Sequence, residues 1–406
     1  MTKTDWKKCK LGDALNFRRG YDLPKDQMSG KGYPVVGSNG IIGYHKEYTT
    51  EAPCLVIGRS GNTGIPALYK YPCWAHNTTL FIDNFKGNYP RFLYYLLKTM
   101  NLQSYAAGSA VPTLNRNHIH PLDISLPPLD EQKRIAEILG SLDDKIELLQ
   151  KQNKTLEDMA KALFKSWFVD FDVVRAKQKG LPKADIMREY HLTEELYDLF
   201  PSSFADSPLG PIPSGWEVKT IQDLGEVVCG KTPSTSHKEY YGGSMPFITI
   251  PDMHNSIFAN KTERYLTSQG EQAQPTKTLP PFSVCVSCIA TPGLVTMTTT
   301  NSQTNQQINS VIPHNLEAKF YNYYVLRSVA DQIRAQGSGG SVFVNLNKTA
   351  FSKIKVLWAD QSLQKLFTKE SESYFNKILN NLKQIQTLTE LRDTLLPRLI
   401  SGKIRV

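Results

Sequence analysis

The chain is built from two similar halves, and this internal repeat constrains its fold more than any other feature of the sequence. Trp6 recurs as Trp216, at an offset of 210, and Gln132-Lys133 recurs as Gln364-Lys365, at an offset of 232. Further matches lie between these ends: Pro53 with Pro281, Asn77 with Asn305, and Tyr94-Tyr95 with Tyr323-Tyr324. The offset grows only in the middle, so the second copy carries about 20 extra residues in its loops. A period this long predicts a duplicated domain pair rather than a solenoid of short repeats.

Both copies have the same internal order. Each starts with a Gly- and Pro-rich part that contains short β-like runs, continues with a shorter helix and ends in a long one. This order predicts an α+β fold in which two duplicated α/β domains are joined by two long antiparallel coiled-coil helices. We assign the domains to residues 1–127 and 214–358, the central helix to 128–170, the connector to 171–213 and the C-terminal helix to 359–406.

The two predicted long helices carry a seam of residues at alternating steps of four and three over about five heptads. Such a seam is typical of a coiled coil. The alternative is an ordinary amphipathic core helix, whose apolar positions would drift off a strict period of 3.5 residues. Each seam contains one asparagine, Asn153 or Asn381, and a buried asparagine needs a polar partner. Pairing the two predicts an antiparallel register in which the numbers of facing residues sum to 534, so that Trp167 meets Phe367.

Two details of the helices can be read from the same pattern. Asp130 precedes the first seam and is its predicted N-cap. In the second helix the register places Arg392 beside Leu142, from where its guanidinium has to extend outward past the seam.

The connector is expected to be a spanning segment rather than a third domain, with one short helix near residues 193–200. At the end of the central helix, residues 166–171 bring together more apolar side chains than one narrow seam can bury. One interpretation is that Phe168 and Phe171 form a docking patch for a partner protein. The other is that they close the end of the coiled coil or cover a domain, and the sequence does not decide between the two.

Charge is distributed in blocks along the chain, whose net charge is +9. Residues 1–127 hold 15 basic and 8 acidic residues, whereas residues 128–213 hold 12 and 16. Basic blocks favour surfaces for a polyanion, and the acidic block favours a surface for protein. The sequence starts with charged residues and contains no apolar run of about 18 residues. These two features predict a cytoplasmic protein, in which the cysteines are reduced.

Motifs for catalysis are absent from the sequence. It has no Gly-rich phosphate loop ending in Gly-Lys-Ser/Thr and no Asn/Asp-Pro-Pro-Tyr/Phe tetrapeptide of an amino-methyltransferase. Cys285 and Cys288 have metal-like spacing, but they lie in one β-like run whose thiols would not face a single ion, so we expect a buried structural pair. We therefore expect no catalytic residue, no metal site and no cofactor on this chain.

The loops instead carry polar, basic and small residues at similar places in both copies. Arg, Lys, Asn and Gln side chains read base edges or bind phosphates, and small residues let the backbone approach. For each residue alone a solvated turn is the plainer interpretation, but their recurrence favours DNA binding. The expected DNA-contacting residues are Arg18, Arg19, Tyr21, Ser38, Asn39, Arg59, Asn62, Asn77, Thr78, Ser109, Asn115 and Arg116 in the first copy and Lys231, Thr232, Ser234, Tyr240, Gln306, Gln307, Ser338, Asn345 and Lys348 in the second.

Several stretches resemble the specificity subunit of type I restriction–modification enzymes, and the resemblance covers essentially the whole chain. The stretches are Gly32–Tyr44, Cys54–Gly64, Gly108–Asn115 and Leu126–Ala136 in the first copy and Gly230–Ser234, Tyr240–Gly243 and Leu395–Lys403 in the second. The entry to the second long helix, Trp358–Gln364, departs from the pattern because it lacks the Pro-Pro-Leu and Glu-Gln of the first.

The resemblance implies two target recognition domains, each reading one half of a split, asymmetric site in double-stranded DNA, and helices that set the spacer between the halves. It implies two DNA methyltransferase subunits that use S-adenosylmethionine, and restriction/translocase subunits that use ATP and Mg, as partners. The alternative is a stand-alone DNA methyltransferase or nuclease with an unrecognised active site. A third possibility is a scaffold coiled coil that binds no DNA.

Overall fold

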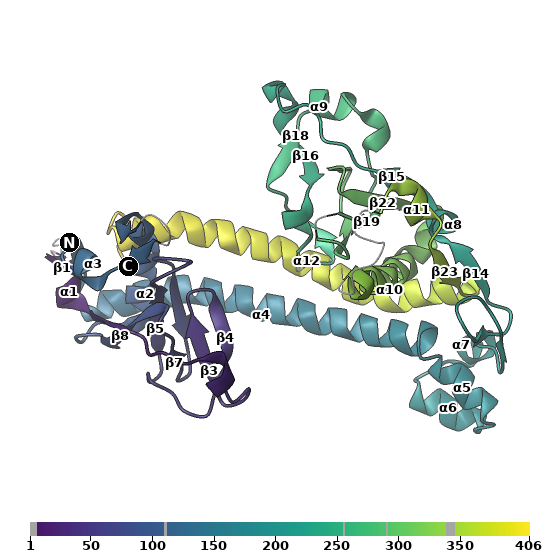
Figure 1. Cartoon of the computed structure of the whole chain (residues 1–406), viewed down its shortest axis with the longest axis horizontal. Coiled ribbons are helices and arrows are strands. Elements are labelled where there is room, and N and C mark those ends of the chain that lie inside the picture. The colour runs from purple at the N-terminus through teal and green to yellow at the C-terminus, as the bar shows by residue number, and fades with distance from the viewer. Residues whose placement is uncertain (1–5, 109–111, 255, 290, 338–345) are drawn as a thin grey trace. The chain divides into compact units, whose positions relative to one another are not determined.

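The computed structural model describes residues 6–108, 112–254, 256–289, 291–337 and 346–406. They form two compact units. Unit 1 is assembled from both ends of the chain, Met1–Leu148 and Ile385–Val406, and unit 2 comprises Leu149–Gln384. Each unit contains one mixed sheet-and-helix domain, called domain one and domain two below, together with parts of the two long helices (Figure 1).

Domain one contains two main sheets in the described residues. The first has the strand order β2 (Asn16–Arg19), β8 (Thr79–Asn84), β5 (Cys54–Gly58), β6 (Pro66–Tyr69), and the second β4 (Gly40–His45), β3 (Tyr33–Gly37), β7 (Trp74–Ala75). Two strand pairs complete it: β1 (Lys7–Lys10) with β11 (Asp123–Leu126), and β9 (Ala106–Ala107) with β10 (Thr113–Leu114). Its helices are α1 (Leu11–Ala14), α2 (Pro90–Thr99) and α3 (Arg116–Ile119).

Domain two repeats this plan with additions. Its first sheet has the strand order β15 (Gly225–Cys229), β22 (Ile308–Pro313), β19 (Val284–Ser287), β20 (Val295–Thr298), β17 (Phe258–Ala259). Its second sheet has the order β18 (Arg264–Leu266), β16 (Tyr241–Ile248), β21 (Gln303–Thr304). β14 (Glu217–Thr220) pairs with β23 (Lys355–Trp358). Its helices are α8 (Ile221–Leu224), α9 (Ser268–Gln272), α10 (Lys319–Gly337) and α11 (Lys348–Ser352). The extra residues of the second copy include β17, which adds a fifth strand.

The duplication read from the sequence is present in the hydrogen bonding of the two domains. In the pair β1–β11, Lys7 faces Leu126, and in β14–β23 Glu217 faces Trp358, which are the same positions at the offsets of 210 and 232. A buried glutamine repeats one contact in both copies, because Gln132 Nε2 donates to the Pro127 carbonyl and Gln364 Nε2 donates to the Ala359 carbonyl. The two domains therefore share topology and strand register.

The two long helices are α4 (Leu129–Phe168) and α12 (Gln361–Ile400), each of 40 residues. Asp130 lies inside the first turn of α4, so its predicted role as N-cap is wrong. Within unit 2 the end of α4 runs antiparallel to the beginning of α12: Asn381 Nδ2 donates to Asn153 Oδ1 at 2.8 Å, and the rings of Trp167 and Phe367 are 6.0 Å apart. These are contacts that the register sum of 534 predicts. No helix among the described residues is both long and apolar enough to cross a membrane.

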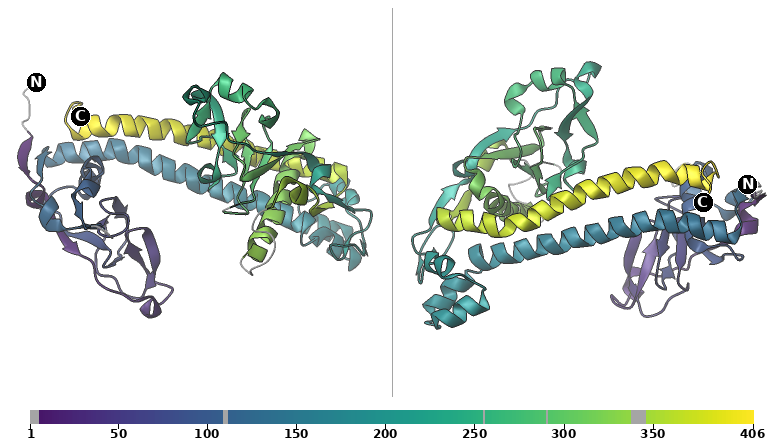
Figure 2. Two further views of the ribbon diagram at one scale, coloured as in Figure 1. Left: turned by 45° about the horizontal axis from the view of Figure 1, so that its top comes forward. Right: turned by 180° about the vertical axis from the view of Figure 1, so that it is seen from behind.

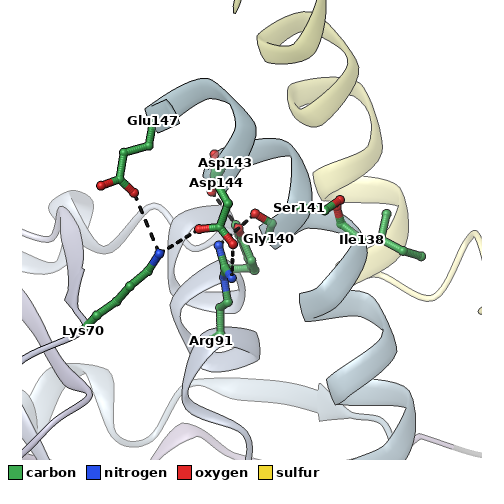
Figure 3. Close-up of polar contacts among 9 residues, drawn as sticks. Lys70, Arg91, Ile138, Gly140, Ser141, Asp143, Asp144 and Glu147 are labelled. Carbon is green, nitrogen blue, oxygen red and sulfur yellow. Dashed lines mark hydrogen bonds and ion pairs between the residues drawn. The ribbon is translucent and has the colours of Figure 1, made fainter. Parts of the chain in front are cut away.

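A polar joint holds domain one against the helices within unit 1 (Figure 3). Arg91 of α2 reaches α4, where its Nη1 lies 2.8 Å from Asp144 Oδ2 and its Nη2 donates to the Gly140 carbonyl. Lys70 Nζ lies 2.8 Å from the other oxygen of Asp144. Tyr95 of α2 donates to Asp143 Oδ2 at 2.6 Å.

The same joint includes α12. Arg392 Nη1 lies 2.8 Å from Asp143 Oδ1, and the two side chains are 18% and 22% exposed. The guanidinium therefore stays half-buried on a carboxylate, and the prediction that it extends outward past Leu142 is wrong. The seam pattern alone gave no partner for Arg392, because Asp143 lies one position off the seam.

Within unit 2, α10 of domain two lies against the long helices (Figure 2), and aromatic side chains form this joint, called the aromatic joint below. Phe320 of α10 stacks on Phe375 of α12 with ring centroids 3.8 Å apart and planes 8° from parallel. Tyr324 of α10 packs on Phe164 of α4 at 5.2 Å. Lys319 binds Glu372 at 3.1 Å at the edge of the joint.

The connector is more structured than predicted. Besides the expected helix α7 (Glu194–Leu199), it forms α5 (Asp172–Gln178) and α6 (Lys183–Glu189), followed by the strand pair β12 (Phe204–Ala205) and β13 (Ile212–Pro213). Val173, Val174 and Ile186 are buried in the main apolar cluster of unit 2. α5 and α6 have 7 residues each, which is too short for a clear helical period of apolar residues. The sequence therefore did not predict these two helices.

Phe168 and Phe171, the predicted docking residues, lie inside unit 2. Phe168 is 4% exposed and packs on Tyr321 with ring centroids 5.0 Å apart. Phe171 is half-buried between Phe204 and Trp216, at 5.8 Å from each ring. Phe168 is therefore a core residue that closes the helices and covers a domain, whereas docking of a partner at the half-buried Phe171 stays a prediction.

Candidate nucleic-acid interface

An open cleft of about 850 Å³ on domain one gathers seven of the predicted DNA-contacting residues. They come from four separate parts of the sequence: the end of β2, the β5–β6 connection, the turn before β8 and the loop before α3. The seven residues are Arg18, Arg19, Tyr21, Arg59, Asn77, Asn115 and Arg116. The lining also includes Asp22, Ala107, Thr113 and His118 among others, none of which is among the predicted DNA-contacting residues.

Strand pairing explains why these distant residues meet. β2 and β5 both pair with β8, so the residues at their ends reach the same edge of the sheet. Arg59 N donates to the Thr78 carbonyl at 2.8 Å, and Leu114 N donates to the Arg59 carbonyl at 2.8 Å. Gly20 lies against another strand so closely that a Cβ there would be 2.1 Å from the His76 carbonyl oxygen. Only glycine fits at that position.

The cleft concentrates positive charge. Arg18, Arg19, Arg59 and Arg116 line it, and in the part of the chain that the structure describes none of the four is held in an ion pair. Burial, assisted by the neighbouring charge of Arg19, lowers the pKa of Arg59. Unpaired guanidinium groups held together in this way attract an anion.

Two hydrogen bonds fix the loop before α3 at the cleft wall. Asn115 uses its side-chain oxygen to cap α3, since Asn117 N donates to it at 3.0 Å. Arg116 Nη1 donates to the Phe17 carbonyl at 3.1 Å. The Arg116 side chain is therefore held in place by the backbone of β2, and within the described ranges no acidic side chain pairs with its charge.

The other predicted residues of domain one that the structure describes lie outside the cleft lining. Asn39 and Asn62 are exposed in turns, and Ser38 accompanies Asn39 at the β3–β4 turn. Thr78 Oγ1 accepts a hydrogen bond from Ser38 N at 3.3 Å. Ser109 lies outside the described residues.

The predicted residues of domain two are not gathered in one cleft among the described residues. Thr232 Oγ1 donates to Gln306 Oε1 at 2.7 Å, and this is the contact that joins two of the predicted residues. Lys231 and Ser234 are exposed beside them, Tyr240 stacks on His237, Gln307 accepts from Asn305, and Lys348 starts α11. Ser338 and Asn345 lie outside the described residues.

A neighbouring hollow of domain two, of about 670 Å³, is lined by Lys238, Tyr241, Arg264 and Tyr265 among others. None of these four residues is among the predicted DNA-contacting residues, although Tyr241 lies in the family-like stretch Tyr240–Gly243. Arg264 and Tyr265 lie in the part of the second copy where the two copies differ in length, so the repeat offered no partner from which to read them.

The structure corrects the matching of one loop between the copies. His76 N donates to the Val36 carbonyl, and Asn305 N donates to the Ile248 carbonyl at the equivalent point. His76 thus corresponds to Asn305 with an offset of 229, and the predicted match of Asn77 with Asn305 at 228 is wrong. The chemical identity of the two asparagines hid a one-residue shift that backbone hydrogen bonds reveal. Asn77 corresponds to Gln306.

Neither domain offers a metal centre in the described residues, which contain no group of three or more His, Cys, Asp or Glu side chains able to hold an ion. Cys285 lies in β19, and Cys288 follows that strand directly. Both are buried, which raises the pKa of Cys285 to about 12 and that of Cys288 to about 11. Protonated buried thiols behave as small apolar side chains.

Comparison with known proteins reveals one family. The model of the type I restriction modification DNA specificity domain matches twice, at residues 3–158 and 213–389. The HindI specificity subunit of Haemophilus influenzae is 38% identical over 99% of this chain and 100% of its own length. The MjaIX specificity subunit of Methanocaldococcus jannaschii is 26% identical over 84% of this chain and 76% of its own. A crystal structure of a type I restriction–modification S subunit from M. genitalium aligns with TM-score 0.63 at 16% identity, covering 98% of this chain and 97% of that one.

Proposed function

The chain belongs to the family of type I restriction–modification DNA specificity subunits, and on that premise we propose that each of its two domains reads one half of a split, asymmetric DNA site. Specificity subunits are not the catalytic subunits of these enzymes, and this chain is one of them. A stand-alone methyltransferase or nuclease is therefore not favoured.

The observation that carries this proposal is the arginine cleft of domain one. Phosphate contacts from Arg and Lys position a protein on DNA, whereas contacts to base edges specify the sequence. The cleft offers both kinds of group, since Tyr21, Asn77 and Asn115 line it together with four arginines that form no ion pair among the described residues. We assign residues 1–127 to the first reader and residues 214–358 to the second.

The long helices support a spacer between the two half-sites. Each has 40 residues, which corresponds to a length of about 60 Å at 1.5 Å per residue. Successive turns of one DNA face are about 34 Å apart. A helix of this length is long enough to place two readers at least one turn apart.

The partners are double-stranded DNA, two DNA methyltransferase subunits and, in the full complex, restriction/translocase subunits. S-adenosylmethionine would be used by the methyltransferases, and ATP with Mg by the restriction subunits. This chain would supply sequence recognition and a scaffold, and the assembly would act in the cytoplasm.

The test is a domain exchange in the assembled enzyme. Residues 1–127 are replaced by the equivalent domain of a relative, and N6-methyladenine is mapped in genomic DNA. We expect one half of the methylated sequence to change while the other half and the activity persist. A methylated sequence unchanged in both halves would contradict the proposal.

A second test addresses phosphate contact. Arg18→Ala and Arg19→Ala are each expected to lower the slope of binding against salt by about one unit, with similar weakening on all DNA sequences. Arg188→Ala is the matched control, because Arg188 is exposed and lies on α6, where it binds Asp185. Unchanged affinity and slope in both cleft variants would show that the β2 end is only a solvated turn.

A further inference from the structure

One side-chain contact recurs at equivalent positions of both domains with different chemistry. In domain one, Asn77 Nδ2 donates to Asp22 Oδ1. In domain two, Thr232 Oγ1 donates to Gln306 Oε1. Asp22 and Thr232 follow the equivalent glycines Gly20 and Gly230 by two residues.

Backbone contacts show that the two pairs are truly equivalent. Tyr21 N donates to the Ala75 carbonyl and Lys231 N donates to the Thr304 carbonyl, and these two carbonyls are again related by the offset of 229. A Cβ at Gly20 or at Gly230 would lie 2.1 Å from the carbonyl oxygen of His76 or of Asn305. The same close approach of two loops therefore presents one variable polar pair in each domain.

The placement of the pair indicates a role outside the core. Asp22 and Gln306 are exposed, so the pairs contribute little to stability. Asp22 and Asn77 line the arginine cleft. A carboxylate repels phosphate, so a position in this cleft that carries Asp22 is suited to a base edge rather than to the DNA backbone.

The chemistry of Asp22 fixes the amide of Asn77. An ionised carboxylate only accepts hydrogen bonds, so Asn77 must turn its NH₂ group toward Asp22. Its Oδ1 and second N–H have no partner among the described residues, and Asn77 lines the open cleft. One acceptor beside one donor matches N6 and N7 of adenine in the major groove.

The Thr232 hydroxyl imposes no such orientation. A hydroxyl donates or accepts, so it can pair with either end of the Gln306 amide. The two domains would then present different donor–acceptor patterns from the same structural position, as readers of two different half-sites require.

We propose that Asp22–Asn77 and Thr232–Gln306 are the specificity-determining pairs of the two domains, with Asn77 reading an adenine and Asp22 positioning the Asn77 amide. The proposal rests on the function proposed above. It adds to that function the identity of the base-reading position in each domain.

The experiment exchanges the pairs in the full complex. Asp22→Thr with Asn77→Gln installs the domain-two pair in domain one, and Thr232→Asp with Gln306→Asn does the reverse. Mapping of N6-methyladenine is expected to show a change at one base of the corresponding half-site only. The salt slope of binding to mixed-sequence DNA is expected to stay as in the parent complex, because the exchange changes no arginine or lysine that could contact phosphate.

A single variant separates positioning from general binding. Asp22→Asn lets the Asn77 amide turn over, so discrimination against other bases at the adenine position is expected to fall by about 10- to 100-fold. Loss of affinity by the same factor on every sequence, or an unchanged methylated sequence in the exchanged pairs, would overturn the proposal. If the domain exchange still moves a half-site in that case, the pair assignment fails and the proposed function stands.

Discussion

The joints between domain and helix differ between the two units, although the domains share one fold. In unit 1, Arg91 and Tyr95 of α2 bind Asp144 and Asp143 of α4. In unit 2, the equivalents of Arg91 and Tyr95 are Phe320 and Tyr324, and Phe320 stacks on Phe375 of α12. The offset of 232 relates Asp143 to Phe375, so a carboxylate in one copy corresponds to a benzene ring in the other.

This difference shows that domains of one fold can be held on their helices by different interactions, apolar burial in one unit and charged hydrogen bonds in the other. The aromatic joint buries apolar area, which stabilises without strong dependence on salt or pH. The polar joint depends on charged hydrogen bonds with defined geometry, whose net contribution is smaller and weakens as carboxylates are protonated. We therefore expect the stability of unit 2 to be higher than that of unit 1 and to depend less on salt and pH.

The largest expected effect tests the aromatic joint. Phe375→Ala removes a fully buried ring and is expected to destabilise unit 2 by about 3–5 kcal/mol. Hydrogen exchange of α10 in the full chain measures it, with Leu316→Ala as the control because Leu316 is 55% exposed. A loss below about 1 kcal/mol would mean that the stacked pair is dispensable.

The next effect tests the polar joint. Asp143→Ala removes the partner of the Tyr95 hydroxyl and one of the two carboxylates that Arg392 binds, the other being Asp393, and is expected to cost about 1–3 kcal/mol. Protection of α2 against hydrogen exchange is expected to fall while that of α10 stays unchanged. Equal loss of protection in α2 and α10 would contradict the proposed difference between the two joints.

A third prediction concerns Gly140. Alanine usually stabilises the middle of a helix relative to glycine by about 1 kcal/mol. Here a Cβ would lie 2.4 Å from Arg91 Cζ, so Gly140→Ala is expected to displace the guanidinium and to destabilise by about 1 kcal/mol instead. In an Arg91→Ala background the same change is expected to stabilise. Chemical denaturation of the four chains gives this coupling, and additive effects would argue against it.

The smallest effect is a pH dependence confined to unit 1. The hydrogen bond from Arg91, with that from Lys70, lowers the pKa of Asp144 from 3.8 to about 2. Its contribution to stability is therefore complete above about pH 3.8 and is lost as the pH falls through about 2. The side chain is 44% exposed, so solvent screening keeps the effect small. The stability difference between the parent chain and Asp144→Asn should shrink over this range, and a constant difference would contradict the assignment.

The elements that repeat or recur with a period could be predicted from the sequence. The duplication, both long helices and the contact of Asn153 with Asn381 all follow from spacing, because spacing decides which residues share a face. The polar joint could not be predicted, since Arg91 and Asp144 lie in elements whose packing only the tertiary fold determines. Asp22 could have been found from its offset of 210 to Thr232, but a lone exposed carboxylate gives no signal for DNA binding.

The site residues divide in a similar way. Residue type pointed to Arg18, Arg19, Arg59 and Arg116, and strand pairing brings all four into one cleft. For Phe168 the sequence left two interpretations open, because exposed and buried aromatic residues look alike in a sequence. Its burial depends on Tyr321, which lies far away along the chain, in the second copy of the repeat.

The assembly of unit 1 from two distant segments has a consequence for biosynthesis. Ile135 and Leu139 share one apolar cluster with Leu399 and Ile400, and the whole of unit 2, Leu149–Gln384, is translated between these two pairs. At about 5–20 residues per second the ribosome needs about 10–50 s for that stretch. During this interval the nascent chain presents an uncompleted apolar seam to water. Chaperone dependence of the chain is therefore expected to rise when translation slows.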